Sequence, residues 1–464
     1  MAEDAVAAKR RRRCTDGGGD MVALPEHVLQ EILSRVGTVK DLFMFAATCR
    51  RWLSCFTDRT FLRELLCPGQ GQGQSQSLLG FFLQDARQGA TMATTRTEAA
   101  RQLASACSFL PAPGSPLAPG PTARALTSSL VADGDGAFDY AVPLAARRGI
   151  VLMQCVPRRR DTHLLLGVCN PVTGERHLLA PLRRNPTRVC GYAIITAADA
   201  DADAAGRFTF SQLLVAIVQP SDWVVHLHSY SAATRSWSAP TVCVVNCRCF
   251  SLRGQRSAVV HQGAAHWLYH TSGLYDDGGQ RALPASRDDG SLFMLSVQLG
   301  GGAAAAAAGG IGFAFTRIPV RVGGISTLLC VTGDGKLAVV CGYMSHVAVS
   351  TCREQRQAGG GGGGQAWERT AFKIPAAVPY PDTAPMWQPK EKWFDLTRGS
   401  MLVLYRSSAV FIVDLHSKTM EKVMDCFLPL FADQMNRTAV PYEMDLVDFF
   451  MLKLGGLSST RSSG

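Results

Sequence analysis

The sequence predicts an α+β multi-domain chain in which a small all-α domain precedes a mostly-β domain with the pattern of a diverged β-propeller. Residues 24–66 carry short groups of apolar residues at helical spacing. From about residue 140, short β-type runs alternate with turn residues to the end of the sequence. At 464 residues with 47% hydrophobic content, the chain has room for two or three domains and a large core.

Composition divides the chain into four regions. We expect a disordered basic tail at residues 1–20, the helical domain at 21–67, a linker and irregular region at 68–137, and the β domain at 138–464. A β-type run at residues 78–83 interrupts the irregular region and is a candidate for closing the β domain.

The helical domain is predicted to hold three or four short helices. Leu29, Ile32, Leu33 and Val36 follow the i, i+3, i+4, i+7 pattern, with Pro25 in the first turn and Gly37 as a stop signal. Thr38 is a candidate N-cap for a second helix, since Asp41 follows it as a weak capping box. A third group surrounds Trp52, and Asp58 is a candidate cap for a fourth helix that carries Phe61.

A unit this small cannot bury all of the apolar residues that it carries. The excess indicates either a surface for a partner protein or a helical cap packed on the rest of the chain, and the pattern alone leaves both open.

Residues 24–66 of the helical domain resemble the motif of the F-box family. They agree with it in residue type and spacing over about forty residues. They depart from it at Gly37, where the family usually has proline, and at Ala46, where a basic residue is common. The resemblance implies docking to a Skp-type adaptor and, through it, to a cullin–RING ubiquitin ligase. The residues that it implies for adaptor binding are Leu24, Pro25, Leu29, Ile32, Leu33, Val36, Leu42, Cys49, Trp52 and Phe61.

In the β domain, hairpin candidates alternate with a recurring motif. This motif consists of a β-type run, a polar turn and then a basic or Trp residue. Each hairpin together with the motif that follows it has the size of a propeller blade. Turn signals within them include Asp334-Gly335 and Arg398-Gly399. The alternative is a pair of non-repeating β-sandwiches. The five expected units span residues 138–181, 190–240, 257–319, 327–375 and 393–424.

The two ends of the chain supply the strands for ring closure. Residues 442–447 alternate apolar and acidic side chains, so we expect a half-buried strand there that pairs with residues 78–83. A C-terminal helix is the alternative, because Met444, Val447 and Phe450 also fit a 3.6-residue period.

A second, weaker resemblance lies at residues 170–182, with the sequence NPVTGERHLLAPL. It is similar to an NP-x-T-G element of plant-type F-box proteins that carry an associated β-propeller-like domain.

Charge and cysteine content favour a nuclear and/or cytoplasmic protein. Of the net charge of +10, five charges come from Lys9, Arg10, Arg11, Arg12 and Arg13, so the body is only mildly basic and no direct nucleic-acid binding is expected. The basic cluster is a nuclear import candidate or a merely solvated tail. Fifteen scattered cysteines without a signal peptide favour a reducing compartment, and no run is long enough to span a membrane.

Several stretches imitate chemical sites, and none has the required pattern, so we predict no catalytic, cofactor or metal site. The acidic run that begins at Asp199 lacks the glycine and glutamate of a calcium loop. Cys243, Cys247 and Cys249 have no second ligand pair at zinc spacing. His266 and His270 lie on a predicted strand and not on a helix.

Together these features favour a non-catalytic substrate-recognition subunit of a Skp–cullin–F-box ubiquitin ligase, with the β domain binding an unknown protein substrate. Alternatives are a non-degradative scaffold that binds the adaptor without recruiting a substrate, and a propeller enzyme with a helical appendage.

Replacing all five basic residues of the tail by alanine tests the import signal. We expect a fluorescent fusion to shift from the nucleus to the cytoplasm, because this is the densest basic cluster of the sequence. An unchanged distribution would mean that the tail is only solvated.

Overall fold

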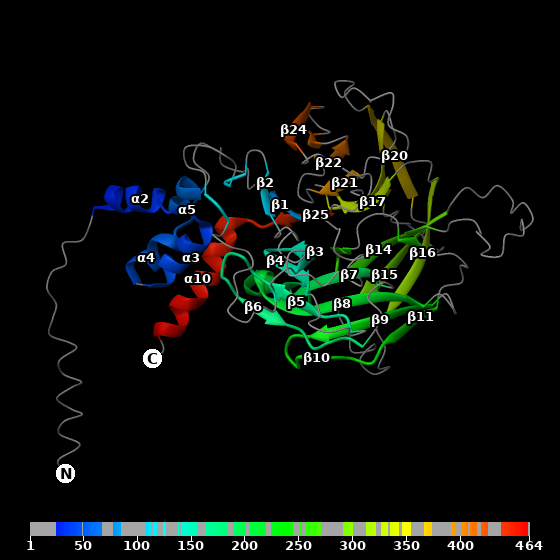
Figure 1. Cartoon of the computed structure of the whole chain (residues 1–464), viewed down its shortest axis with the longest axis horizontal. Helices are drawn as coiled ribbons and strands as arrows, with labels where there is room; N and C mark the ends of the chain where they lie inside the picture. The colour runs from blue at the N-terminus through cyan, green and yellow to red at the C-terminus, as the bar shows by residue number, and fades with distance from the viewer. Residues whose placement is uncertain are drawn as a thin grey trace, which may run out of the picture.

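The structure is a computed structural model of the whole chain (Figure 1). The basic tail lies outside the described residues. The residues that the structure describes are 25–48, 50–66, 78–84, 108–112, 115–117, 124–126, 138, 141–155, 163–183, 189–200, 204–219, 224–244, 251–252, 257–270, 291–299, 312–321, 326–332, 335–342, 346–353, 366–373, 391–394, 401–406, 409–414, 419–425 and 438–462.

Four helices form the helical domain. Both predicted caps are present: Thr38 Oγ1 accepts from the Asp41 amide at 2.9 Å, and Asp58 Oδ1 accepts from the Thr60 amide at 2.7 Å. The first helix ends at Ser34, one turn before the predicted stop at Gly37, so Val36 lies beyond it. The helices are α2 (Glu26–Ser34), α3 (Val39–Thr48), α4 (Arg50–Phe56) and α5 (Arg59–Leu66).

The β domain is a five-bladed propeller of antiparallel sheets (Figure 1). The first blade contains β3 (Val142–Arg147), β4 (Ile150–Gln154), β5 (Leu166–Cys169) and β6 (Arg176–Leu178). The second contains β7 (Val189–Thr196), β8 (Phe210–Gln219), β9 (Val224–Ser231), β10 (Ser236–Trp237) and β11 (Thr241–Val244), with α8 (Ala197–Ala200) and η2 (Ala204–Phe208) between β7 and β8.

The third blade contains β12 (Ser251–Leu252), β13 (Val259–His261), β14 (Ala264–His270), β15 (Ser291–Gln298) and β16 (Phe313–Arg321). The fourth contains β17 (Ser326–Val331), β18 (Leu337–Gly342), β19 (His346–Arg353) and β20 (Ala366–Lys373). The fifth contains β21 (Glu391–Phe394), β22 (Met401–Arg406), β23 (Ala409–Asp414) and β24 (Thr419–Asp425).

These blades confirm the propeller in preference to a pair of sandwiches. Gly335 has φ +74° in the β17–β18 hairpin, a conformation that glycine adopts without strain, which explains the turn signal there. Asp334, Arg398 and Gly399 lie outside the described residues.

A three-stranded sheet joins the two ends of the chain. β1 (Leu78–Gln84) lies between β2 (Ser108–Pro111) and β25 (Thr438–Glu443), which confirms the expected pairing of early and late strands. Pro441, which has no N–H, is tolerated because β25 is an edge strand of this sheet. The sequence did not predict β2, which lies within the region expected to be irregular.

The expected strand at residues 442–447 is wrong in its C-terminal half. β25 ends at Glu443, and helix α10 (Leu446–Ser462) begins two residues beyond Met444. Asp445 is the reason: its Oδ1 accepts from the Asp448 amide at 3.0 Å, which caps the new helix. Both alternatives for this segment were therefore partly correct.

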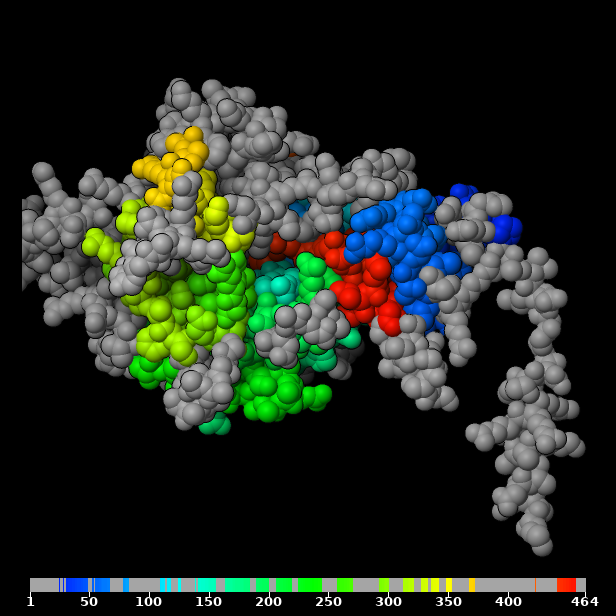
Figure 2. Space-filling view, turned by 180° about the vertical axis from the view of Figure 1, so that it is seen from behind, coloured from blue at the N-terminus to red at the C-terminus, as the bar shows by residue number. Residues whose placement is uncertain are grey.

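Helix α10 lies between the helical domain and the first two blades, as Figure 2 shows from behind. The Phe450 ring is stacked on Phe56 with centroids 5.5 Å apart and meets Phe43 edge-on at 5.7 Å. On the other side, Phe449 meets Phe208 of η2 at 5.2 Å. One hydrophobic core therefore runs from the helical domain through α10 into the β domain.

The segment at residues 124–126 is hydrogen-bonded to the helical domain. The Arg124 guanidinium donates to the carbonyls of Leu65 and Leu33 at 2.9 and 3.3 Å, so it satisfies the C-terminal carbonyls of two helices. Ala125 exchanges backbone hydrogen bonds with Gly37 and Val39.

A chain that ends at Val440 tests whether the C-terminal segment holds the two domains together. It loses half of β25 and all of α10, including two phenylalanines with no exposed surface. We expect the midpoint of thermal unfolding to fall by about 10 °C or more, since each buried Phe contributes about 3 kcal/mol. A chain that ends at Ser462 is the control, and an unchanged melting profile after truncation at Val440 would show that the segment is peripheral.

Candidate functional site

The helical domain carries exposed apolar side chains on two of its helices. Ile32 of α2 is 44% exposed, and Met44 and Phe45 of α3 are 50% and 46% exposed. They are three of the six large hydrophobic residues that are exposed in the described part of the chain. Such residues mark a surface that a partner protein can bury.

The residues implied for adaptor binding fall into three groups in this structure. Pro25 and Ile32 are exposed, and Val36 and Trp52 are half-buried against the shared core. Leu33, Leu42 and Phe61 are buried inside that core, where they support the surface rather than form it. Leu24, Cys49 and the Leu29 side chain lie outside what the structure describes, so their contact with an adaptor stays a prediction.

Met44 and Phe45 were not among the residues singled out from the sequence. The available signal was the unbroken apolar run from Leu42 to Ala46, which is too long for one face of a helix. Leu42 and Phe43 take the buried face of α3, so the two residues after them are turned outwards.

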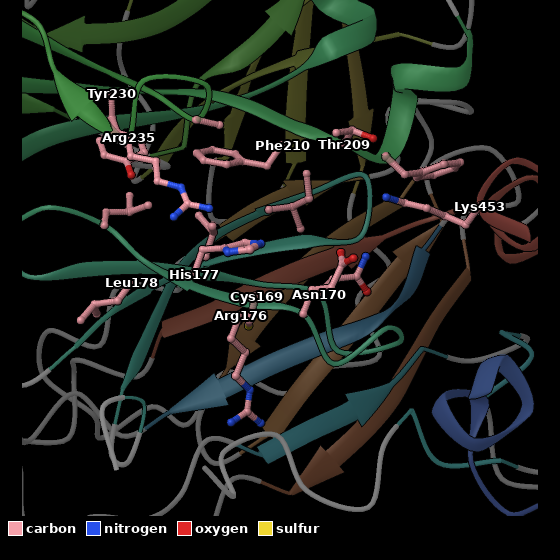
Figure 3. Close-up of a pocket in the computed structure, with 16 residues that line it drawn as sticks. Cys169, Asn170, Arg176, His177, Leu178, Thr209, Phe210, Tyr230, Arg235 and Lys453 are labelled. Carbon is pink, nitrogen blue, oxygen red and sulfur yellow. The ribbon is translucent and has the colours of Figure 1, made fainter. Parts of the chain in front are cut away.

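The β domain contains a second candidate site, a cavity of about 500 Å³ between the first two blades and α10 (Figure 3). We call it the inter-blade groove. Its lining residues are Ile150, Val168, Cys169, Asn170, Glu175, Arg176, His177, Leu178, Leu179, Phe208, Thr209, Phe210, Tyr230, Ala232, Arg235 and Lys453.

The NP-x-T-G element builds one wall of this groove. Asn170 is buried, and its Oδ1 accepts from the Val172 and Thr173 amides at 3.0 and 3.3 Å. Gly174 closes the turn at φ +76°, and a Cβ there would lie 3.2 Å from the Lys40 side chain of α3. The turn therefore packs against the helical domain and leads directly into β6, all three residues of which line the groove.

Cationic side chains dominate the polar part of the lining. In Figure 3 the Arg235 side chain extends towards the His177 ring, and Lys453 reaches in from α10. Arg176 points the other way, and its guanidinium carbon lies 5.8 Å from the centre of the Phe138 ring. Glu175 is the one carboxylate among the lining residues.

The acidic run at Asp199 is part of an ion-pair cluster between two blades. Arg147 donates to both carboxylate oxygens of Asp199 at 2.5 and 2.8 Å, and Arg148 lies 3.1 Å away. Burial alone would raise the pKa of Asp199, but the hydrogen bond and charge of Arg147, the Thr196 amide and the charge of Arg148 outweigh it and lower the pKa to about 2. Its carboxylate is thus held by arginines; the later acidic residues of the run, Asp201 and Asp203, lie outside the described residues.

The other sequence stretches that imitate sites are parts of the core. His266 lies on a strand as predicted, its Nδ1 is 2.8 Å from Ser296 Oγ, and burial lowers its pKa to about 4. Burial raises the pKa of the Cys243 thiol to about 11, while Cys247 and Cys249 lie outside the described residues. Among the described residues, no three His, Cys, Asp or Glu side chains lie together as a metal site would require, and no helix has the length and hydropathy of a membrane span.

Comparison with known proteins identifies the helical domain. Residues 21–67 match the F-box-like family model. No curated protein matches the chain.

Solved structures match part of the chain at low identity. A β-propeller domain of the Trilobed protease from Pyrococcus furiosus is 8% identical, with 61% of this chain and 82% of that chain covered and a TM-score of 0.31. A functionally unknown protein from Desulfotomaculum acetoxidans is 11% identical, with 61% and 69% covered and a TM-score of 0.29. Since both scores are below 0.5, neither likeness carries an argument about function.

Asp199→Asn tests the inter-blade ion pairs. The pKa of Asp199 is depressed in the folded state, so its contribution to stability is present above about pH 4 and is lost as pH falls towards 2. We expect the variant to lose about 2 kcal/mol of stability at pH 7 and to converge with the wild type near pH 2, in denaturant titrations at both pH values. An equal loss of stability at pH 7 and near pH 2 would contradict an electrostatic origin of the stabilisation by Asp199.

Proposed function

We propose that this protein is the substrate-recognition subunit of a Skp–cullin–F-box ubiquitin ligase. The premise is that residues 21–67 form an F-box-like domain ahead of a five-bladed β-propeller. F-box domains in general bind Skp-type adaptors. The helical domain would bind the adaptor and through it the cullin, while the propeller would bind a target protein.

The accessible apolar residues of the helical domain support the adaptor role. Ile32, Met44 and Phe45 are exposed although their helices have a well-packed core on the opposite side. A few apolar anchors of this kind dominate the affinity of most protein–protein interfaces. Pro25, also exposed, lies at the N-terminal end of α2 in the same domain.

The observation that carries the proposal is the shared core of the two domains. A recognition subunit works by holding its target at a fixed place relative to the rest of the ligase, which raises the effective concentration of target lysines near the ubiquitin carrier. Packing of Phe449 and Phe450 between the helical domain and the blades favours such fixed geometry. Ubiquitin transfer itself would take place on other subunits, so no residue of this chain needs a catalytic role.

The proposed location is the nucleus and/or the cytoplasm, where cullin-based ligases act. It is supported by the basic cluster at residues 9–13 and by the odd number, fifteen, of scattered cysteines in the sequence.

Single substitutions at the exposed apolar residues test the adaptor contact. We expect Phe45→Asp and Ile32→Asp each to weaken binding of a purified Skp-type adaptor by about 30-fold, since a buried charge replaces an interface anchor. Calorimetric titration of the full chain measures this, and thermal unfolding shows that the fold is retained.

Phe313→Asp is the matched control, because Phe313 is 40% exposed on β16 of the third blade and should not touch the adaptor. Adaptor affinity at the wild-type level in both helical-domain variants would overturn the proposed function. Accumulation of a bound protein after depletion of this chain would distinguish a degradative receptor from a scaffold.

A further inference from the structure

The inter-blade groove has an unbalanced charge. Arg235 and Lys453 lie at its two sides, and neither has an ion-pair partner within the part of the chain that the structure describes. His177 lies between them in Figure 3. Against these stands the single carboxylate of Glu175. The groove is therefore complementary to an anionic ligand.

The apolar part of the lining favours a ligand that is not anionic throughout. Leu178 is 49% exposed at the groove, one of the most exposed large hydrophobic residues that the structure describes. The Phe210 and Tyr230 rings are stacked with centroids 6.5 Å apart and form an aromatic wall opposite β6. A ligand that fits both halves combines carboxylates with an apolar side chain.

The backbone of β6 favours an extended polypeptide. All three residues of β6 line the groove, although the Arg176 side chain points away from it onto Phe138, so the groove follows the course of the strand. Among the described strands, β6 is the terminal strand of its sheet, and extended peptides can bind by adding a strand at such a sheet edge.

Arg235 occupies a backbone conformation that does not suit its residue type. Its φ is +52°, in the left-handed region that glycine and asparagine prefer. The strain alone does not mark a site, since Gln262 has a similar φ in a turn away from the groove. Here the conformation places the only charged group of the β9–β10 turn over the groove.

We propose that the inter-blade groove binds an acidic segment of the target protein, in extended conformation, with its carboxylates at Arg235 and Lys453 and an apolar side chain at Leu178 and Phe210. This inference rests on the proposed function and adds to it the site and chemical class of the target. Because Lys453 belongs to α10 and the β6 turn touches Lys40, a segment in the groove is held close to the adaptor-binding domain.

Fluorescence anisotropy with the full chain tests this, with a labelled synthetic peptide of alternating Glu and Leu as the probe and its Gln-for-Glu analogue as the neutral control. We expect Arg235→Gly and Lys453→Gln each to weaken binding of the acidic peptide by about 5- to 10-fold, as for loss of one charge-assisted contact. Arg235→Gly should melt no lower than the wild type, because glycine relieves the strained φ, so lost binding cannot be attributed to lost folding.

Two controls match these variants. Gln262→Gly makes the same replacement at another exposed residue with positive φ, +46°, in the β13–β14 turn, and Lys336→Gln removes an exposed charge from the fourth blade. Both should bind the acidic peptide as the wild type does.

Equal affinity for the acidic and neutral peptides, or wild-type affinity in both groove variants, would overturn the inference. Complete competition by citrate at the peptide's own concentration would also overturn it, since the groove would then bind a small anion and not a segment. The groove variants should retain adaptor binding. A wild-type chain that binds the adaptor but not the acidic peptide would refute the groove alone. Absence of adaptor binding in the wild type would refute the proposed function.

Discussion

The packing of α10 against the helical domain is the interaction on which the rest of the structure depends. Four short helices cannot form an independent core of sufficient size, because a unit of about forty residues buries too little apolar surface. Phe449 and Phe450 supply the missing surface: they fill the space between α3, α4 and η2 and have no exposed area. The ion pairs of Asp448 with Arg59 and Arg207 lie at the rim of this cluster and orient the helix. These partially exposed pairs contribute little free energy, so the aromatic packing dominates.

The C-terminal segment contacts both the first blade and the helical domain. β25 pairs with β1 and is bonded to the first blade, where the Gly149 amide donates to the Glu443 carbonyl at 3.2 Å. Two residues later Asp445 caps α10, so the chain passes from the propeller to the helical domain without a flexible connection. The N-terminal and C-terminal parts of the chain are therefore interdependent, and a change in one is expected to destabilise the other.

The sequence allowed prediction of what depends on local pattern and concealed what depends on contacts between distant residues. Helix caps at Thr38 and Asp58 and the five blades follow from short-range signals such as capping oxygens, turn glycines and β-type runs. The extra strand β2 was not predictable, because its four residues, Ser108–Pro111, carry too short a β-type pattern by themselves and gain their structure from pairing with β1. The inter-blade groove was missed for the same reason: Arg235 and Lys453 are more than two hundred residues apart, although the NP-x-T-G element that forms its wall was recognised.

The helical domain and the propeller, joined by the shared aromatic core, are expected to form one rigid unit. The most direct measurement is the distribution of distances between two spectroscopic labels, one at Ser34 on the helical domain and one at Ala233 on the second blade, both exposed. We predict a single narrow distribution for the wild-type chain and a broader one for Phe450→Ala, in which the aromatic cluster is broken. A broad or multiple distribution in the wild type, or one that Phe450→Ala leaves unchanged, would contradict the account.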